Sequence, residues 1–205
     1  MIKKVDEMNN EEKEKLLKNI IEDLERSLSN ERYLHSISTM KKAKEIAKQY
    51  VIDELTVILT SVAHDIAKEM TNEEYLLYAK ENNIKLDETD KIENRILHGK
   101  IGAHIVGKKY GFTKEMQEAI YYHTTGRKNM TLLDKIVFLA DKSENRRESE
   151  DAEKLRKIIK KEGLDNAILW DIDYYIIPKM IKKQKMIHPN SIYARNDIIS
   201  KINVN

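Results

Sequence analysis

A histidine and an aspartate stand side by side at positions 64 and 65, inside a run that is otherwise apolar. The run from Leu55 to Ala67 predicts a helix that is buried on most of its circumference. Because an unpaired buried carboxylate costs several kcal/mol, Asp65 needs a partner. A metal cation would supply one, with His64 as a companion ligand. The alternative at this point is a hydrogen-bonded His-Asp pair inside an ordinary helical core.

Further side chains on other predicted segments could join this dyad, and they are His35, His98, His123 and Asp141. Asp141 falls on the apolar stripe of its predicted helix, so it is a second carboxylate that needs a partner, either a cation or an arginine. His98 and His104 are six residues apart, which on a helix separates their side chains by about 120°. Only one of them can face the site, and we select His98 because His104 has an ordinary amphipathic position.

Together these imidazoles and carboxylates, without thiolates, suit Fe, Mn, Co, Zn or Ni. Six ligands exceed the needs of one tetrahedral site, so the set predicts two metals about 3.5–4 Å apart with Asp65 as the bridge. Such a pair holds a hydroxide at neutral pH and clamps the oxygens of a phosphoryl group. Lys68, one turn after His64, can reach a phosphate as a point charge.

Helices must position these residues. The composition includes six glycines and two prolines in 205 residues, and it favours an all-α protein. The hydrophobic periodicity and the capping signals predict helices over 11–28, 31–49, 53–68, 72–82, 95–109 and 164–182. Further helices are expected after Thr113, after Thr131 and over 192–202, with a polar loop at 83–93, a charged linker and helix face at 143–161, and a turn at 188–191.

Composition also excludes several functions. The net charge of +2 gives no case for nucleic-acid binding, and the absence of cysteine excludes disulfides and thiolate ligands. The first thirty residues have no apolar core of a signal peptide, and no stretch approaches the roughly 20 apolar residues of a membrane span. We therefore expect a cytoplasmic protein, and a homodimer is left open.

The order of these residues resembles the HD-domain phosphohydrolase superfamily, with a first His, an HD dyad, two intermediate His and a final Asp. Longer motifs resemble the YqeK family within it. They are Arg32-Tyr33-x-His35, His64-Asp65-Ile66-Ala67-Lys68, Leu97-His98-Gly99-x-x-Gly102-Ala103, Tyr122-His123-Thr124-Thr125-Gly126-Arg127, Asp134-Lys135-Ile136-Val137-x-Leu139-Ala140-Asp141-Lys142 and Ile187-His188-Pro189-Asn190-Ser191-Ile192-x-Ala194-Arg195-Asn196.

This resemblance implies an HD-domain helical bundle over 29–205, with residues 1–28 as an additional N-terminal helix. It implies symmetrical hydrolysis of diadenosine tetraphosphate to two ADP by a centre of two Fe, or of Mn, Co or Ni. The implied core ligands are His35, His64, Asp65 and Asp141, with His98 and His123 as second-metal ligands or phosphate contacts. Arg32 and Arg147 would meet phosphates, while His188, Pro189 and Ser191 would line the nucleotide end.

In the predicted mechanism a metal-bridging hydroxide attacks phosphorus, Asp65 holds the metals, and Lys68 with the arginines stabilises the phosphate charge. One departure from the family is the stretch 142–145, where members have an aromatic-isoleucine pair and a proline. Two other functions stay open at this point. An HD phosphohydrolase could act on a dNTP, a cyclic nucleotide or an alarmone, or the chain could be a binding module that senses a nucleotide.

Overall fold

Helices make up the regular structure of residues 2–92 and 96–202, which are the residues that the computed structural model describes, and this part contains no strand. The expected all-α class is confirmed. After a short 3₁₀ turn at Val5–Glu7 the helices are α1 (Asn10–Ser27), α2 (Asn30–Ala47), α3 (Glu54–Val62), α4 (Asn72–Glu81), α5 (Glu88–Ile92), α6 (Leu97–Tyr110), α7 (Lys114–Tyr122), α8 (Leu132–Ser143), α9 (Glu150–Glu162), α10 (Leu164–Asp171), α11 (Ile177–Lys182) and α12 (Pro189–Ile202).

Polar caps begin several of these helices at the residues expected from the sequence. The Thr71 hydroxyl accepts a hydrogen bond from the Glu74 backbone N–H, and the Glu74 side chain accepts one from the Thr71 backbone, which completes a capping box. Thr131 forms the same box with Asp134 at α8. The start of a helix is therefore well determined by local chemistry in this chain.

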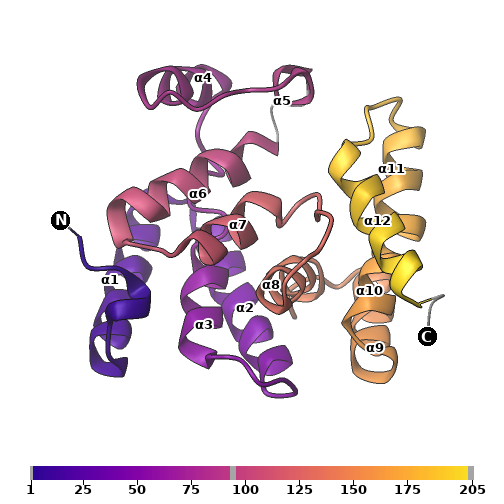
Figure 1. Ribbon diagram of the computed structural model, residues 1–205, viewed down its shortest axis with the longest axis horizontal. Coiled ribbons are helices and arrows are strands. Elements are labelled where there is room, and N and C mark those ends of the chain that lie inside the picture. The colour runs from indigo at the N-terminus through magenta and orange to yellow at the C-terminus, as the bar shows by residue number, and fades with distance from the viewer. Residues whose placement is uncertain (1, 93–95, 203–205) are drawn as a thin grey trace.

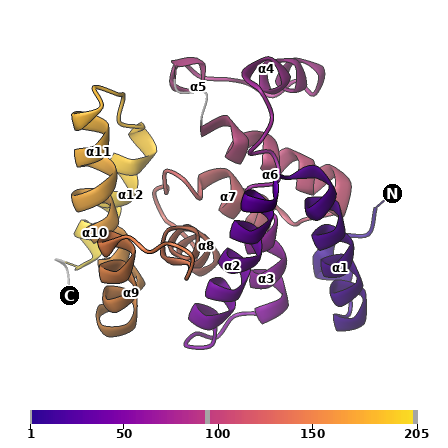
Figure 2. The ribbon, with the colours of Figure 1, turned by 180° about the vertical axis from the view of Figure 1, so that it is seen from behind.

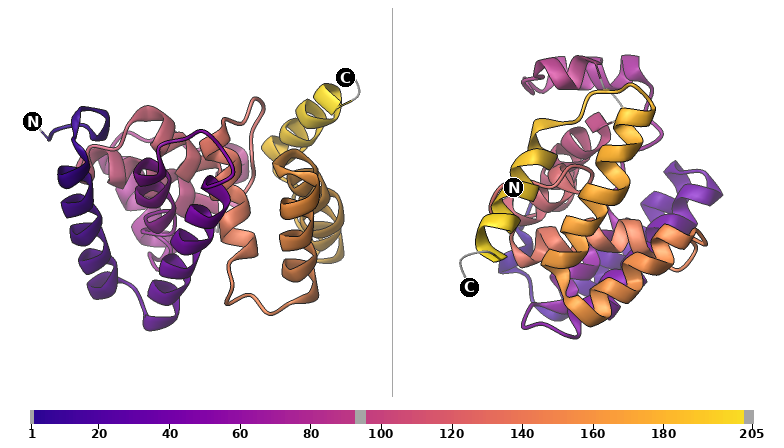
Figure 3. Two further views of the ribbon diagram at one scale, coloured as in Figure 1. Left: turned by 90° about the horizontal axis from the view of Figure 1, so that it is seen from below. Right: turned by 90° about the vertical axis from the view of Figure 1, so that its right-hand side faces the viewer.

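The helices form two main layers, seen side by side in Figures 1 and 3. Helices α1, α2, α3, α6, α7 and α8 make the first layer, and α9 to α12 make the second, which packs on α8. Figure 2 shows α4 and α5 at the edge of the first layer, beyond α6. Helix α8 lies at the centre, because Ile136, Phe138 and Leu139 have no exposed surface. The second layer therefore closes over the helix that carries Asp141.

Helix α1 joins the same core. Its Ile20 and Leu24 are fully buried in the apolar cluster that contains α3 and α8. The predicted stripe of this helix is thus confirmed as a packing face. The division of the chain into residues 1–28 and 29–205 stays a prediction.

The expected helix over 53–68 is too long. Helix α3 ends at Val62, so His64 and Asp65 lie in the turn that follows it. The hydrogen bonds there join residues three apart, with Ile66 N donating to Ala63 O at 3.1 Å and Lys68 N to Asp65 O at 2.9 Å. The apolar residues of this turn are buried like those of the helix, so periodicity alone did not reveal the change.

Three other expectations also need correction. The predicted loop at 83–93 contains the short helix α5, whereas helix α9 agrees with the charged linker and helix face expected over 143–161. The long helix over 164–182 is divided by a π-helical turn at Ile172–Ile176, just before Pro178, because proline lacks the N–H that continues an α-helix. Helix α12 begins at Pro189, three residues earlier than expected, so the predicted turn at 188–191 is largely its first turn. Residue 93 of the predicted loop and residue 95 of the predicted helix lie outside the described residues.

Gly99 allows α6 and α7 to pack closely at the site. A Cβ atom at this position would lie 2.8 Å from the Tyr121 carbonyl oxygen and 3.1 Å from that of Ile120. Real Cβ atoms essentially never lie within 3.0 Å of a backbone oxygen, so only glycine lets the two backbones approach this far. The approach brings His98, the neighbour of Gly99, against the end of α7.

Of the helices described, none combines the length and the apolar character that crossing a membrane would require.

Candidate metal centre and its pocket

Asp65 lies at the middle of a cluster of imidazole rings and is 1% exposed. Its Oδ1 atom faces one pair of histidines, 3.2 Å from His98 Nε2 and 3.5 Å from His123 Nε2. Its Oδ2 atom faces the other pair, 3.6 Å from His64 Nε2 and 3.8 Å from His35 Nε2. The two oxygens of a single carboxylate therefore point to two different groups of nitrogen atoms.

Asp141 reaches the cluster from α8 and completes one of these groups. Its Oδ1 atom lies 3.1 Å from His35 Nε2 and 3.8 Å from His64 Nε2. Two sets of three side chains have donor atoms within 4.8 Å of one another, namely His35, His64 and Asp141, and His64, Asp65 and His123. Residues separated by up to 106 positions in the chain thus converge on one point.

The far sides of the rings are held by hydrogen bonds that decide which nitrogen is available. His64 Nδ1 lies 2.8 Å from the Ser61 carbonyl oxygen, and His123 Nδ1 lies 2.6 Å from that of Ile120. A carbonyl oxygen can only accept, so each Nδ1 carries the proton and donates it. In the neutral ring the Nε2 lone pair then points into the cluster, which is the tautomer of a metal ligand.

This arrangement fits a divalent cation better than it fits a closed hydrogen-bond network. Within the described part of the chain, His35 Nε2, His64 Nε2 and Asp65 Oδ1 are buried without a hydrogen-bond partner. His98 Nε2 and His123 Nε2 lie only 3.1 Å apart. Lys68 Nζ lies 2.9 Å from His98 Nε2. Converging acceptors repel one another unless a positive charge lies among them, so the donor set could hold a metal.

The protonation of His64, Asp65 and Asp141 agrees with this conclusion. Burial lowers the pKa of His64 to about 4, so its ring is neutral at pH 7, as a ligand must be. Burial would raise the pKa of Asp65 and Asp141, but the surrounding imidazoles and cations lower both well below the usual value. Burial also opposes the charge of His35, yet the neighbouring carboxylates of Asp141 and Glu144 raise its pKa to about 9, so this ring would have to release a proton to bind a metal.

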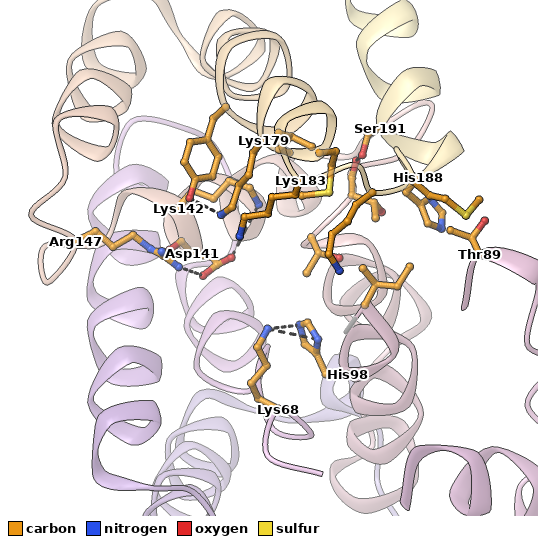
Figure 4. Close-up of a pocket in the computed structure, with 18 residues that line it drawn as sticks. Lys68, Thr89, His98, Asp141, Lys142, Arg147, Lys179, Lys183, His188 and Ser191 are labelled. Atoms are coloured by element: carbon orange, nitrogen blue, oxygen red, sulfur yellow. Dashed lines mark hydrogen bonds and ion pairs between the residues drawn. The ribbon is translucent and has the colours of Figure 1, made fainter. Parts of the chain in front are cut away.

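A pocket of about 350 Å³ opens directly onto the cluster (Figure 4). Its floor is formed by Lys68, His98 and Asp141, so the cluster is reached through it. Figure 4 shows Arg147 at one end of the pocket, and His188, Ser191 and Thr89 at the other. Such a pocket could hold an elongated, charged ligand with one part on the cluster.

The structure places several predicted phosphate contacts beside the centre. Arg147 donates through Nε to the Asp141 backbone oxygen at 2.6 Å and through Nη2 to Asp141 Oδ1 at 3.0 Å. Arg32 Nη1 lies 3.8 Å from Asp65 Oδ2, and Lys68 Nζ lies 3.5 Å from Asp65 Oδ1. The sequence pattern 142–145, which departs from the family, still leaves Arg147 in contact with the cluster.

The predicted nucleotide end is only partly assembled at the pocket. His188 and Ser191 line it, and the Ser191 hydroxyl donates to the Thr125 carbonyl at 2.9 Å. Pro189 is exposed at the start of α12 and is not among the lining residues described. His104 stays away from the cluster, with Nδ1 3.0 Å from the Tyr78 hydroxyl.

Sequence reasoning missed two buried carboxylates at the site. Glu144 Oε1 lies 3.3 Å from His35 Nδ1 and therefore orients that ring. Its spacing of three residues after Asp141 on a helical stretch was the signal that could have found it. Asp171, at the end of α10, is 2% exposed beside Lys142 and Arg147. Nothing local marks Asp171, because only the packing of α10 on α8 brings it there.

Comparison with known proteins gives consistent matches. The HD domain family matches residues 32–146, a range that contains His35, the dyad and Asp141. The symmetrical bis(5'-nucleosyl)-tetraphosphatase of Halalkalibacterium halodurans is 34% identical over 175 residues, which cover 84% of this chain and 91% of that protein. The protein of the same name from Bacillus subtilis is 27% identical and covers 86% of this chain and 94% of its own length.

A solved structure has the same fold. It is described as a predicted HD superfamily hydrolase involved in NAD metabolism from Clostridium acetobutylicum, and it superposes with a TM-score of 0.85 at 33% identity. The match covers 90% of this chain and 97% of that one. Both layers of helices are therefore shared with a related structure.

Proposed function

This chain belongs to the HD domain family, and we propose that it hydrolyses diadenosine tetraphosphate symmetrically to two molecules of ADP. The observation that carries the proposal is the position of Asp65, whose two oxygens face separate groups of imidazoles beneath a pocket rich in cations. The relatives named for this activity cover most of the chain, which supports the substrate.

The first metal would be held by His35, His64, Asp65 and Asp141, and a second by Asp65 with His98 and His123. Histidine and carboxylate ligands suit iron, with Mn, Co or Ni as substitutes. Bound divalent cations supply an activated water at neutral pH and neutralise charge on the phosphoryl oxygens. The hydroxide bridge expected from the sequence stays a prediction, as do the cytoplasmic location and the homodimer.

The protein residues orient the substrate and the ligands. Lys68 and Arg147 border the floor of the pocket, where they can bind phosphate oxygens and stabilise the charge that develops during attack. Glu144 holds His35, and the carbonyls of Ser61 and Ile120 hold His64 and His123. The water oxygen forms a bond to the phosphorus on one side of the central bridging oxygen, the bond from that phosphorus to the bridging oxygen breaks, and the bridging oxygen leaves on the second ADP. The two protons of the water pass to the terminal phosphates of the products or to solvent. The reaction needs no covalent bond to the protein.

Product analysis tests this function. Protein purified without oxygen and supplied with Fe(II), Mn(II) or Co(II) should convert diadenosine tetraphosphate to ADP alone. In water enriched in ¹⁸O, the label should appear on the terminal phosphate of ADP. His104→Asn serves as the control, because this histidine lies outside the cluster and should leave turnover unchanged.

Other products would decide against the proposal. ATP with AMP would show asymmetric cleavage. Hydrolysis of a dNTP, a cyclic nucleotide or an alarmone in preference to the dinucleotide would show a different substrate. Tight nucleotide binding without turnover for every metal would show a binding protein.

A further inference from the structure

One face of α11 and of the π-helical turn before it lines the pocket. Tyr175, Lys179 and Lys183 follow at intervals of four residues, and all three are lining residues. Residues with this spacing share one side of a helix. Tyr174 and Ile181 point the other way, since they are 69% and 64% exposed. This segment therefore presents two ammonium groups to the pocket, together with the apolar Ile176 and Met180, while Tyr174 and Ile181 face solvent.

These lysines lie on the opposite wall from the metal centre. Figure 4 shows Lys179 and Lys183 extending from their helix across the pocket from Lys68 and His98. They are long enough to reach a ligand in the pocket, and neither is a neighbour of a metal ligand in the sequence. We call Lys179 and Lys183 the α11 lysine pair.

The described residues neutralise this pair only in part, through the electrostatic interaction of Asp171 with Lys179. Lys179 Nζ lies 2.8 Å from the Tyr175 hydroxyl, and among the described residues neither lysine forms an ion pair with a carboxylate. Two like charges four residues apart on a helix repel each other. The cost of this repulsion falls when an anion lies between them.

The charge of the whole lining indicates the kind of anion. The lining contains the cations Lys68, Lys142, Arg147, Lys179, Lys183 and Lys185, and within the described part of the chain its one carboxylate is Asp141. A single phosphate at the metal centre would not reach both walls. A chain of phosphates that continues past the cleaved bond would contact both.

We propose that the α11 lysine pair is a second phosphate-binding site, which holds the phosphates of the ADP that leaves. This inference rests on the proposed function and adds to it the means by which the enzyme recognises a substrate with phosphates on both sides of the cleaved bond. The metal centre binds the attacked half, and α11 binds the other half. The pair contributes to substrate binding and does not contact the attacking water.

Binding of a substrate analogue tests the pair directly. The probe is diadenosine tetraphosphate with a methylene group in place of the central bridging oxygen, titrated calorimetrically into metal-depleted and metal-loaded protein. In Lys179→Gln/Lys183→Gln the Kd should rise about tenfold or more in both states, because charge-assisted hydrogen bonds to phosphate are lost. The dependence of Kd on salt should also become weaker. Binding of AMP, which has too few phosphates to reach both walls, should change less than twofold.

Lys182→Gln is the matched control. Lys182 is the neighbour of Lys183, is exposed and has the same charge, but it does not line the pocket. Its variant should bind the analogue as the parent does. The exposed single variant Lys183→Gln should weaken binding without a change in Tm, which separates a loss of binding from a loss of folding.

Kinetics distinguish this inference from the proposed function. For the double variant we expect a KM raised about tenfold with kcat within twofold of the parent. Unchanged Kd and KM in the double variant, with ADP still the sole product, would overturn the α11 site and leave the proposed function intact. Equal losses in Lys182→Gln and Lys183→Gln would also overturn it, because net charge alone would then explain the effect. No cleavage by the parent would refute the function, while the calorimetric titration would still decide the binding role of the pair.

Discussion

The candidate metal centre and the wall formed by the π-helical turn, α11 and the start of α12 face each other across one pocket, yet they are built differently. In the centre, His64, Asp65 and His123 are at most 1% exposed, and the hydrogen bonds on the far sides of the rings hold them in place. On the wall, Lys179 is half-buried and Lys183 is exposed, and both are long and flexible. The centre is preorganised by packing, whereas the wall presents flexible charged side chains.

This difference has a physical consequence. A buried ligand cluster fails when one member is lost, because the other members are then left unpaired in a site of low polarity. An exposed lysine is partly replaced by water and salt, so its loss is milder. Substitutions on the floor of the pocket should therefore lower activity strongly, and substitutions on its wall should lower it only mildly. The following predictions test this contrast in order of size.

Asp65→Asn should have the largest effect. The amide keeps the shape of the side chain but cannot bind two cations, so we expect turnover to fall by more than about a hundredfold with a matching loss of bound metal. Metal analysis of the purified variant, together with the ADP assay, measures both quantities. Asp6→Asn, on the surface, is the control. A variant that retained metal and activity would contradict the bridging role.

Glu144→Gln should weaken the centre without removing a ligand. Glu144 is 2% exposed and orients His35, so its loss should lower metal affinity or activity about 10–100-fold. Activity titrated against Mn(II) would show the shift, and excess metal should restore most of the rate. Glu148→Gln, an exposed neighbour four residues later, is the matched control. An unchanged metal titration would mean that packing alone holds the His35 ring.

Lys68→Met should lower activity less than Asp65→Asn or Glu144→Gln does. Its side chain is 27% exposed, so it acts as a partly hydrated point charge at the edge of the centre. We expect kcat/KM to fall about tenfold, which is below the effect of a rigid donor aimed at the transition state. Lys80→Met on α4 controls for the loss of one charge. A loss as large as that of Asp65→Asn would place Lys68 among the preorganised residues of the floor.

Asp171→Asn should change stability with little effect on turnover. Burial raises the pKa of Asp171 from 3.8 to about 6, so the folded protein holds its proton more tightly than the unfolded chain does. The stabilising contribution of the neutral Asp171 carboxyl to folding is fully present below pH 3.8 and is lost as the pH rises through about 6. The asparagine variant should therefore gain about 1–3 kcal/mol at pH 7.5, and the gain should shrink at pH 5.

Thermal unfolding at the two pH values measures this gain. A variant that is less stable than the parent at pH 7.5 would show that the Asp171 carboxylate is needed beside Lys142, as a structural counter-ion of the wall.

The helices were largely predictable because their signals are local. Thr71 and Thr131 cap α4 and α8 where the sequence predicts it, and the buried stripe of α1 follows from spacing alone. The end of α3 at Val62 was not predictable, since a turn with buried apolar residues has the same composition as a buried helix. The π-helical turn before Pro178 does have a local signal, since proline lacks the N–H that continues an α-helix.

The sequence by itself determined which side chains could bind a metal, because histidines and carboxylates at apolar positions need a partner, and a chain without cysteine offers no thiolate ligands. It also determined, through motifs, the family to which the chain is similar. Only the tertiary structure decided that Asp65 divides its two oxygens between two groups of rings, that Glu144 supports His35 and that α11 faces the centre. The reason is that residue type and helical period are local properties, whereas convergence at one point depends on how distant helices pack.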